Sequence, residues 1–480
     1  NEVGESLMNT ISTKHMFATD SARTNCKMGV VHLGFGAFHR AHQAVYLDDY
    51  MAQSGDLNWG IAAVNLRLSE YDHFQAAAAD ISQHDGYFLK SYSADGQVEL
   101  RRVRSHVGFY DWCSDINNSQ KILALDTVHL VTITVTESGY YTDANGDLII
   151  DDPHILNEIN NNLQLTVYGY LRASLLSRVA AGGAPLTIAC CDNIRQNGKM
   201  LQRNLLAYLK ICNDTDLISW VTDNVAFPSS MVDRITPRTS LELSIELSEL
   251  IGIKVSSPIM AEDFTQWVLQ DNFSNNMPNL TDVGVTITSD IDPYEETKIR
   301  VLNGGHTALT YLAALEKIRT FDMVMQIPHL FAHFKGFECE EVLPALTIEL
   351  PFSKYKYLEK IEQRFNNQAI GDTVSRICAD GMAKFPIFIR PTLEGCFAQG
   401  IIPIFSIRSI ASWHQFAQHV LAGKVDFDYL EPSWDSLSSM LGRDEFINSR
   451  QLWGEIPKTY PKFAEILRLE IFKMEQKWPV

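Results

Sequence analysis

The chain has 480 residues, of which 46% are hydrophobic and 20% charged, and it is therefore long enough for a globular protein of two or three domains. Its 40 basic and 58 acidic residues give a net charge of −18, which would repel a phosphate backbone and argues against a nucleic-acid partner. No window approaches 18 consecutive apolar residues, and the N-terminal sequence lacks the order of a signal peptide. These features predict a cytoplasmic protein with no membrane partner.

The 8 cysteines are scattered, without a CxxC pair, which favours reduced thiols over a disulfide framework or a zinc cage. Residues 1–28 are polar and irregular, and they predict a loosely attached arm.

A strand, a glycine turn and a helix follow. The apolar run at 30–33 is typical of a β-strand, and Gly34 and Gly36 come directly after it. Glycines at such a turn let the backbone approach a pyrophosphate, so Gly34, Gly36 and the following Phe38 are candidates for binding a dinucleotide. The motif GxGxF lacks the third glycine of GxGxxG, and an ordinary βα turn is the alternative.

The histidines of FHRAH could suggest a metal site. His39 and His42 are three residues apart, but no HExxH motif or third ligand is near them. A packing role, or a position near the phosphates, is favoured. We therefore predict no metal site and keep His39 among the cofactor-binding candidates.

A second apolar run at 59–67 has the character of the second strand of a βαβ unit. It ends at Arg67, a further candidate for binding the cofactor, and Glu70 follows. An acid after this strand commonly binds the adenosine ribose of NAD and repels the 2′-phosphate of NADP. Glu70 comes later than the usual spacing, so the preference for NAD is moderate and a solvated carboxylate is the alternative.

Residues 75–125 contain turns and segments that alternate with a period of two, and they predict a β-rich insertion or sheet extension with a hairpin at 92–96. The β-branched stretch at 128–141 predicts a buried parallel strand, which carries Thr136 and Glu137 at its carboxyl end. Doubly wound sheets bind ligands at that end of their strands. Both residues are therefore candidates for contacting the cofactor.

A strand predicted at 186–191 is followed by Asn193, a further candidate at a strand end. Asp233 and Arg234 lie in a proline-bounded loop and could simply pair with each other. The spacing of apolar residues at 260–273 predicts a helix packed in the core.

After Pro293 helical patterns dominate, which places a domain boundary near 285–293. We predict a sheet domain over 1–288 and a mostly helical domain over 289–480. The expected helices of the second domain lie at 295–318, 354–366, 369–383, 408–422 and 459–477.

The stretch at 294–312 concentrates polar side chains in an apolar helical pattern. On an ideal helix Asn303 and His306 lie at roughly 140° and 80° from Lys298, so the three share one side. The alternative is a lysine whose ammonium group reaches the surface, a capping asparagine and a core histidine. Farther on, Arg376 and Lys384 flank a predicted bend at Asp380-Gly381, where surface charge is the ordinary interpretation.

Seven segments between about residue 29 and residue 395 resemble, in order, the long-chain polyol-specific dehydrogenase family, and closest are its mannitol 2-dehydrogenase members. These segments are GFGAFHRAHQAVYLDDYM, TVTESGYY, CDNIRQNG, FPSSMVDRITP, QWVLQDNF, PYEETKIRVLNGGHTALTYL and RFNNQAIGDTVSRICADGMAKFP. The K-x₄-N-x₂-H pattern at 298–306 is the most specific of the matches.

The resemblance implies a Rossmann-type, doubly wound N-terminal domain, a mostly helical C-terminal domain and a site between them. It also implies a monomer and a metal-independent, NAD-dependent interconversion of a secondary alcohol and a ketone. Lys298 would be the general acid/base, Asn193 and Asn303 would bind the substrate oxygen, and His306 would orient the substrate. The remaining implied residues are Asp233, Arg376 and Lys384 in the polyol pocket, and Glu295 as a gate for proton exchange.

The chemistry fits these roles. A lysine with an ordinary pKa of about 10.4 must have that pKa lowered by burial or positive charge to act as a base near neutral pH. Arg300, close in the sequence, could contribute. Amide donors stabilise developing negative charge on oxygen without adding a formal charge.

Three functions are compatible with the sequence. The leading one is a polyol dehydrogenase acting on mannitol and fructose or on arabinitol and xylulose. A hexuronate reductase is the alternative, because Arg376 or Lys384 could pair with a uronate carboxylate. A catalytically silent nicotinamide-binding sensor is a more remote alternative.

Overall fold

The computed structural model describes residues 11–12, 25–143, 145–163 and 166–480. Most of the arm expected at 1–28 lies outside these residues. The chain divides into two compact units, Asn1–Asp292 and Pro293–Val480, which are described separately. No helix among the described residues is both long and apolar enough to cross a membrane.

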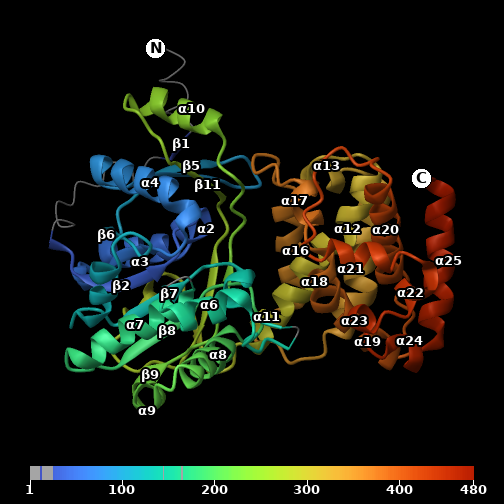
Figure 1. Ribbon diagram of the computed structural model, residues 1–480. Coiled ribbons are helices and arrows are strands. Elements are labelled where there is room, and N and C mark those ends of the chain that lie inside the picture. Colours follow the sequence, from blue (N-terminus) through green and yellow to red (C-terminus); the bar gives the residue numbers. More distant parts are fainter. Residues whose placement is uncertain (1–10, 13–24, 144, 164–165) are drawn as a thin grey trace. The chain divides into compact units, whose positions relative to one another are not determined.

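Within the described residues of the first unit, a six-stranded sheet has the order β6-β3-β2-β7-β8-β9, and all its neighbouring strands are parallel (Figure 1). In chain order this is 3-2-1-4-5-6, the arrangement of a doubly wound dinucleotide-binding sheet, as predicted. The order reverses between β2 and β7. The strands are β2 (Met28–Leu33), β3 (Gly60–Asn65), β6 (His106–Asp111), β7 (Leu130–Ile133), β8 (Leu186–Cys190) and β9 (Val225–Ala226).

Apolar side chains cover both faces of this sheet, which explains why its strands are apolar at nearly every position. Val31 and Leu33 point into one core, whereas Val30, the residue before them, belongs to another. The helices of this unit are α2 (Ala37–Ala41), α3 (Gln43–Ser54), α4 (Tyr71–His84), α5 (Ile116–Lys121), α6 (Pro153–Asn161), α7 (Val167–Ala180), α8 (Asn197–Ile211), α9 (Thr215–Asn224) and α10 (Leu241–Ile251).

Two smaller sheets complete the unit. One has the order β1-β5-β4-β11 and contains the hairpin expected near 92–96, and the other has the order β10-β12-β13. Their strands are β1 (Ile11–Ser12), β4 (Tyr87–Tyr92), β5 (Val98–Val103), β10 (Ser230–Asp233), β11 (Ile259–Glu262), β12 (Gln266–Gln270) and β13 (Thr286–Thr288).

The helix predicted at 260–273 is wrong, because this stretch forms β11 and β12. The i, i+3, i+4 spacing of its large apolar residues was coincidental. β12 is paired on both sides, antiparallel to β10 and parallel to β13, and Trp267, Val268 and Leu269 are all buried. Tertiary pairing therefore overrode a periodicity too short to separate strand from helix.

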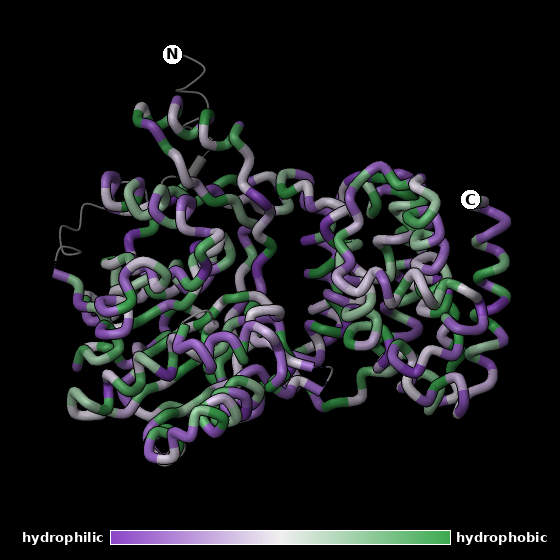
Figure 2. Tube along the Cα trace, viewed as in Figure 1, coloured by the Kyte–Doolittle hydropathy of each residue, from purple (hydrophilic) through white to green (hydrophobic). Residues whose placement is uncertain are grey.

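The second unit is helical, as predicted. Its core gathers aromatic and aliphatic side chains from helices along the whole unit. In Figure 2 the trace of the last helix alternates between hydrophilic and hydrophobic residues, as expected of a helix with one buried face. The α-helices are α11 (Asp292–Thr297), α12 (Gly304–Leu315), α13 (Phe321–Met325), α14 (Pro328–Gly336), α15 (Leu343–Ala345), α16 (Lys354–Phe365), α17 (Val374–Cys378), α18 (Gly381–Lys384), α19 (Arg390–Ala398), α20 (Ile404–Leu421), α21 (Trp434–Ser439), α22 (Arg443–Ile447), α23 (Arg450–Trp453), α24 (Ile456–Thr459) and α25 (Pro461–Lys477).

Three segments of this unit are π-helical rather than α-helical in the part of the chain that the structure describes. They are η7 (Lys298–Asn303), η8 (Phe337–Val342) and η9 (Phe385–Ile389), and η7 packs against both of the others. π-Helical turns are rare and occur often at functional sites. The ideal α-helical geometry expected for 298–306 is therefore wrong for its first part.

Two further expectations were too long. The strand expected at 128–141 ends at Ile133, and 137–140 form a tight helical turn. The helix expected at 369–383 is split into α17 and α18, because Asp380 adopts a left-handed conformation with φ of 61°.

Candidate functional site

The glycine turn after β2 lies where the strand order of the main sheet reverses. The N–H of Gly34 donates to the carbonyl of Val64 on β3, at 2.9 Å. A Cβ at Gly34 would lie 2.1 Å from the carbonyl oxygen of Thr134, and φ there is 95°, so only glycine fits. At Gly36, by contrast, a Cβ would meet no described atom within 4 Å. The turn therefore packs tightly against the sheet at Gly34 and leaves free space next to Gly36. Such free space next to the backbone is what a bulky ligand needs.

The end of β3 holds polar residues but no acid. Asn65 donates to Asp111, and Arg67 donates to the carbonyl of Val135 at 2.8 Å, which ties the end of β3 to the end of β7. Glu70 is exposed and directly precedes α4.

The ends of β7 and β8 carry Thr136, Glu137 and Asn193. Thr136 has φ of 63° and ψ of 165°, which is unusual for any residue with a Cβ. Thr136 and Glu137 are exposed. Asp192, between β8 and Asn193, accepts hydrogen bonds from the N–H groups of Val135 and Thr136.

The histidines of FHRAH are buried. The His39 ring stacks on His32 with 3.4 Å between centroids, and its two nitrogens contact Gln43 and His106 at 3.2 and 2.9 Å. The His39 ring is therefore packed in the core of the unit, although the backbone of His39 lies in the first helical turn after the glycines. His42 contacts the carbonyl of Gln266 at 2.7 Å and stacks on the half-buried Phe38.

Asp233 is buried as the last residue of β10, so the segment expected to be a proline-bounded loop contains a strand. Arg234 is also buried, and its guanidinium donates to the carbonyls of Ala41 and Glu262 at 2.5 and 2.9 Å. Burial lowers the pKa of Arg234 to about 10. Arg234 therefore links the helix after the glycine turn to the smaller sheets.

In the second unit, Lys298 and Asn303 begin and end the π-helical segment η7. Hydrogen bonds in a π-helix join residues five apart, so residues at this spacing lie nearly above one another on one side. Lys298 is buried, at 6% exposure, and Glu295 on the preceding α11 is also buried.

His306 lies in a charged cluster of this unit. Its ring stacks on Phe365 at 4.0 Å, and its Nε2 lies 3.9 Å from Asp372. Burial lowers the pKa of His306 to about 3, although Asp372 opposes the shift. The imidazole is therefore neutral at physiological pH, with one nitrogen able to donate and the other to accept.

Arg376 and Lys384 belong to the same cluster, since their positive charges act on His306. Asp372 accepts two hydrogen bonds from Arg376, both at 2.7 Å, and Lys384 donates to the carbonyl of Ile377 at 2.8 Å. The structure thus brings three predicted residues together within the second unit.

Sequence reasoning missed Asp192 and Asp372, which hold predicted residues in place. Asp192 directly precedes Asn193, and Asp372 comes four residues before Arg376, a spacing that suggests an ion pair on one helical turn. Both signals were present in the sequence.

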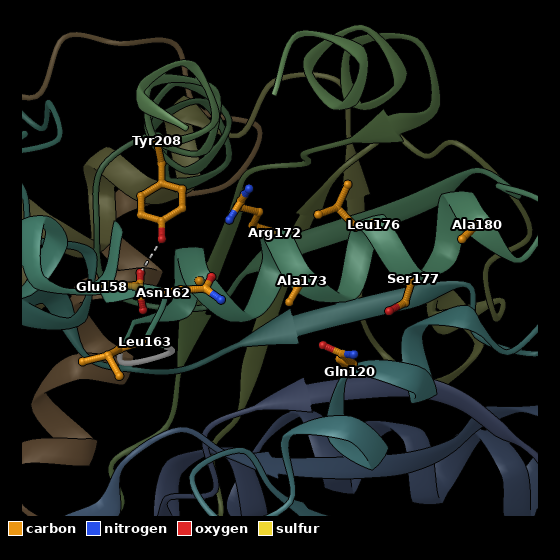
Figure 3. Close-up of a pocket in the computed structure, with 11 residues that line it drawn as sticks. Gln120, Glu158, Asn162, Leu163, Arg172, Ala173, Leu176, Ser177, Ala180 and Tyr208 are labelled. Carbon is orange, nitrogen blue, oxygen red and sulfur yellow. Dashed lines mark hydrogen bonds between the residues drawn. The ribbon is translucent and has the colours of Figure 1, made fainter. Parts of the chain in front are cut away.

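A pocket of about 500 Å³ lies elsewhere, between α5, α6, α7 and α8 of the first unit (Figure 3). Its lining includes Gln120, Arg172 and Leu176, and Tyr208 donates to Glu158 at one end. None of the predicted site residues lines it.

Comparisons with known proteins agree with this architecture. Residues 28–282 match the model of the mannitol dehydrogenase Rossmann domain, and residues 290–466 match that of the mannitol dehydrogenase C-terminal domain. The chain is 35% identical to mannitol 2-dehydrogenase of Cereibacter sphaeroides, over 89% of this chain and 90% of the relative. It is 32% identical to D-arabinitol 4-dehydrogenase of Ralstonia nicotianae, over 89% and 92% of the two chains.

A solved structure of Pseudomonas fluorescens mannitol 2-dehydrogenase, a ternary complex with NAD and D-mannitol, superposes with a TM-score of 0.85 at 30% identity. The alignment covers 98% of this chain and 96% of that chain. This chain therefore belongs to the mannitol dehydrogenase family, as its sequence motifs predicted, and combines a Rossmann-type domain with a helical one.

Proposed function

We propose that this protein is an NAD-dependent, metal-independent oxidoreductase that interconverts a polyol and its ketose, with Lys298 as general acid/base. The observation that carries the proposal is the π-helical segment η7, which begins at buried Lys298 and ends at Asn303, with neutral His306 one turn beyond. Mannitol with fructose and arabinitol with xylulose are the favoured substrate pairs, because relatives with those names match the chain over most of its length.

The first unit fits a nicotinamide dinucleotide. The reversal of strand order, the left-handed Gly34 and the open space at Gly36 are the features that such a ligand needs. Gly34, Gly36 and Phe38 would hold it by the glycine turn, and Thr136 and Glu137 by the β7 turn. When bound, the nicotinamide supplies the acceptor or donor of the hydride.

The residues of this chain would handle the proton and the oxygen. In alcohol oxidation, Lys298 takes the proton of the substrate hydroxyl, and in ketose reduction it returns that proton. Asn193 and Asn303 donate amide hydrogen bonds to the oxygen as negative charge develops on it, and His306 hydrogen-bonds and orients the substrate. Glu295 is buried and comes three residues before Lys298 in the chain. It is the candidate for exchanging the lysine proton with solvent.

Asp233, Arg376 and Lys384 would bind the other hydroxyl groups of the substrate. The Arg376 guanidinium already pairs with Asp372 in a two-bond contact, so its charge is largely compensated. This favours an uncharged polyol over the carboxylate of a hexuronate.

The decisive experiment replaces Lys298 with alanine and measures NADH oxidation with fructose, xylulose, fructuronate and tagaturonate. Turnover should fall by about 10²–10⁴-fold or more, while NADH binding persists. Lys462→Ala is the control, because the side chains of Lys462 and its partner Glu465 are both exposed, at 63% and 66%. Near-normal turnover in Lys298→Ala would refute the role of the lysine.

The same panel separates the alternatives. Preference for fructuronate or tagaturonate would establish a hexuronate reductase, and stoichiometric NADH binding without any turnover would establish a nicotinamide sensor. Repeating the assay with NADPH tests the cofactor preference expected from Glu70.

A further inference from the structure

The carboxylate of Asp192 joins the ends of two neighbouring parallel strands. Asp192 follows β8, and its two oxygens accept from the N–H of Val135 at 2.9 Å and the N–H of Thr136 at 3.1 Å, just after β7. Tyr140 donates its hydroxyl to the same carboxylate at 2.5 Å. Asp192 is 9% exposed. A carboxylate that accepts three hydrogen bonds at this depth is a strong restraint on the backbone around it.

The backbone that Asp192 holds is strained. Thr136 has a positive φ of 63° with ψ of 165°, a region that is populated almost only by glycine, and its β-branched side chain makes the conformation more costly. Such a conformation persists only where its surroundings impose it. The hydrogen bonds from the N–H groups of Val135 and Thr136 to Asp192, which follows β8, hold Thr136 in this conformation.

A third strand restrains the same turn. Arg67, at the end of β3, donates to the carbonyl of Val135 at 2.8 Å and lies 3.5 Å from the hydroxyl of Thr136. The carbonyl of Thr134, one residue before this turn, faces Gly34 so closely that a Cβ there would lie 2.1 Å away. The turn at 135–136 therefore borders the glycine turn at the point where the strand order reverses.

The backbone of Asp192 is itself held. Asn197 donates its amide to the carbonyl of Asp192 at 3.0 Å and to the carbonyl of Ser230 at 2.9 Å. Asp192 is thus a rigid connector between α8, β10 and the β7 turn, and the next residue in the chain is Asn193.

We propose that Asp192 is a positioning residue for the nicotinamide cofactor, and that its carboxylate holds the strained turn at Val135–Thr136 in the conformation that the cofactor binds. The inference rests on the proposed use of NAD. Asp192 would affect cofactor affinity through its contacts with the turn, and not through contacts with the reacting atoms.

The charge state of Asp192 provides a separate readout. Burial raises the pKa of Asp192 to about 6, opposed mainly by the hydroxyl of Tyr140, while the negative charge of Glu137 adds to the rise. Cys190 also contacts the hydroxyl of Tyr140, and burial raises the pKa of the Cys190 thiol well above the usual value, so the thiol stays neutral. Arg67 is a charged side chain that contacts the same turn, through the carbonyl of Val135. Protonated Asp192 loses acceptor strength toward the two N–H groups, so cofactor affinity should fall as the pH drops through about 6.

The test measures NADH binding by fluorescence, without substrate, from pH 5.5 to 7.5, together with the melting temperature of each protein. In Asp192→Asn one oxygen becomes an NH₂ group that faces a backbone N–H, so at pH 7.5 NADH should bind roughly 10- to 100-fold more weakly. The pH step near 6 seen in the wild type should be absent from this variant.

A second substitution distinguishes positioning from general stability. Glycine adopts the backbone angles of Thr136 without strain, so adding Thr136→Gly to Asp192→Asn should restore much of the lost affinity. Glu158→Gln is the matched control. Glu158 is also buried, and its carboxylate accepts three hydrogen bonds, from the N–H and the hydroxyl of Thr166 and from the hydroxyl of Tyr208. None of these three donors belongs to the glycine turn or to the turn at Val135–Thr136. This control should lower the melting temperature and leave NADH affinity unchanged.

The possible results separate the two proposals. Wild-type affinity in Asp192→Asn, or no gain from Thr136→Gly, would overturn the role of Asp192 and leave the proposed dehydrogenase intact. If Asp192→Asn does not fold, a wild-type affinity that is constant from pH 5.5 to 7.5 also overturns it. A wild-type protein that binds no NADH would refute the proposed function, and the inference with it.

Discussion

A directed chain of neutral histidines makes the first unit sensitive to acid. The Nε2 of His42 contacts the carbonyl of Gln266, which can only accept, so this nitrogen carries the proton. The other nitrogen of His42 then accepts from the amide of Gln43, whose oxygen accepts from Nδ1 of His39. Nε2 of His39 is left to accept from Nε2 of His106 at 2.9 Å. Each ring has one tautomer, assigned from the hydrogen bonds, and a second proton on His39 would place two N–H groups against each other.

The sign and size of the effect follow from the lowered pKa values. Burial lowers the pKa of His106 to about 3, and burial together with the neighbouring imidazoles lowers the pKa values of His32 and His39 well below the ordinary value. The unfolded chain therefore binds more protons than the folded protein below pH 6.5, and stability falls as the pH falls. His106 alone contributes a loss that approaches about 1.4 kcal/mol per pH unit well below pH 6.5, and that sums to about 1.7 kcal/mol between pH 6.5 and pH 5. His32 and His39 add losses of the same sign, against a total stability of about 5–15 kcal/mol.

Urea unfolding at pH 5.0, 5.5, 6.0 and 6.5, for the wild type and His106→Gln, tests this reasoning. Glutamine can still donate to His39 but does not titrate. The variant should be less stable at neutral pH, yet between pH 6.5 and pH 5.0 its stability should fall less steeply than that of the wild type, by about 1.1 kcal/mol per pH unit on average. His154→Gln is the control, because the side chain of His154 is 64% exposed. Equal slopes for His106→Gln and the wild type would refute the assignment of His106 as a buried neutral base.

Three other predictions concern the glycine turn and the second unit. Gly34→Ala should lower the melting temperature and abolish NADH binding, measured by fluorescence. The left-handed backbone at position 34 costs about 1–2 kcal/mol for a residue with a Cβ. The added Cβ would also clash with the carbonyl oxygen of Thr134. Burial raises the pKa of Glu338 well above its usual value, and its two oxygens meet no hydrogen-bond partner within the described residues, so it is a neutral acid. Glu338→Gln should then gain stability relative to the wild type as the pH rises from 6 to 9, measured by urea unfolding. Asp372→Asn should raise the KM for the ketose about tenfold by loosening Arg376, with no change in NADH affinity.

Much of the fold could be predicted because local patterns agreed with the tertiary structure. The central strands β2, β7 and β8 are apolar runs buried at nearly every position, and glycine or a polar residue follows each within two positions. The helices of the second unit follow an apolar period over many residues, and such long patterns are the most reliable local signal. The prediction for 260–273 failed because strands of 4 and 5 residues leave too few apolar positions to reveal their period.

The candidate site was predictable only in part, for a related reason. Lys298, Asn303 and His306 are close in the chain, so their spacing already indicated a shared role. The π-helical turn that relates the first two depends on packing against η8 and η9, which come from segments about 40 and 90 residues later. No local pattern in 298–303 distinguishes that turn from an α-helix.

The sequence by itself determined the sheet domain, the helical domain and the residues able to do chemistry, because residue type and short-range spacing carry that information. Only the tertiary structure decided which of these residues are fixed by hydrogen bonds, and which partners form those bonds. Asp192 binds a turn 56 residues earlier in the chain, and His39 meets His106 across 67 residues. Such contacts depend on strand order and burial, and burial also sets whether an imidazole or a carboxylate is charged. The three-dimensional arrangement therefore fixed the protonation states, which the residue types alone leave open.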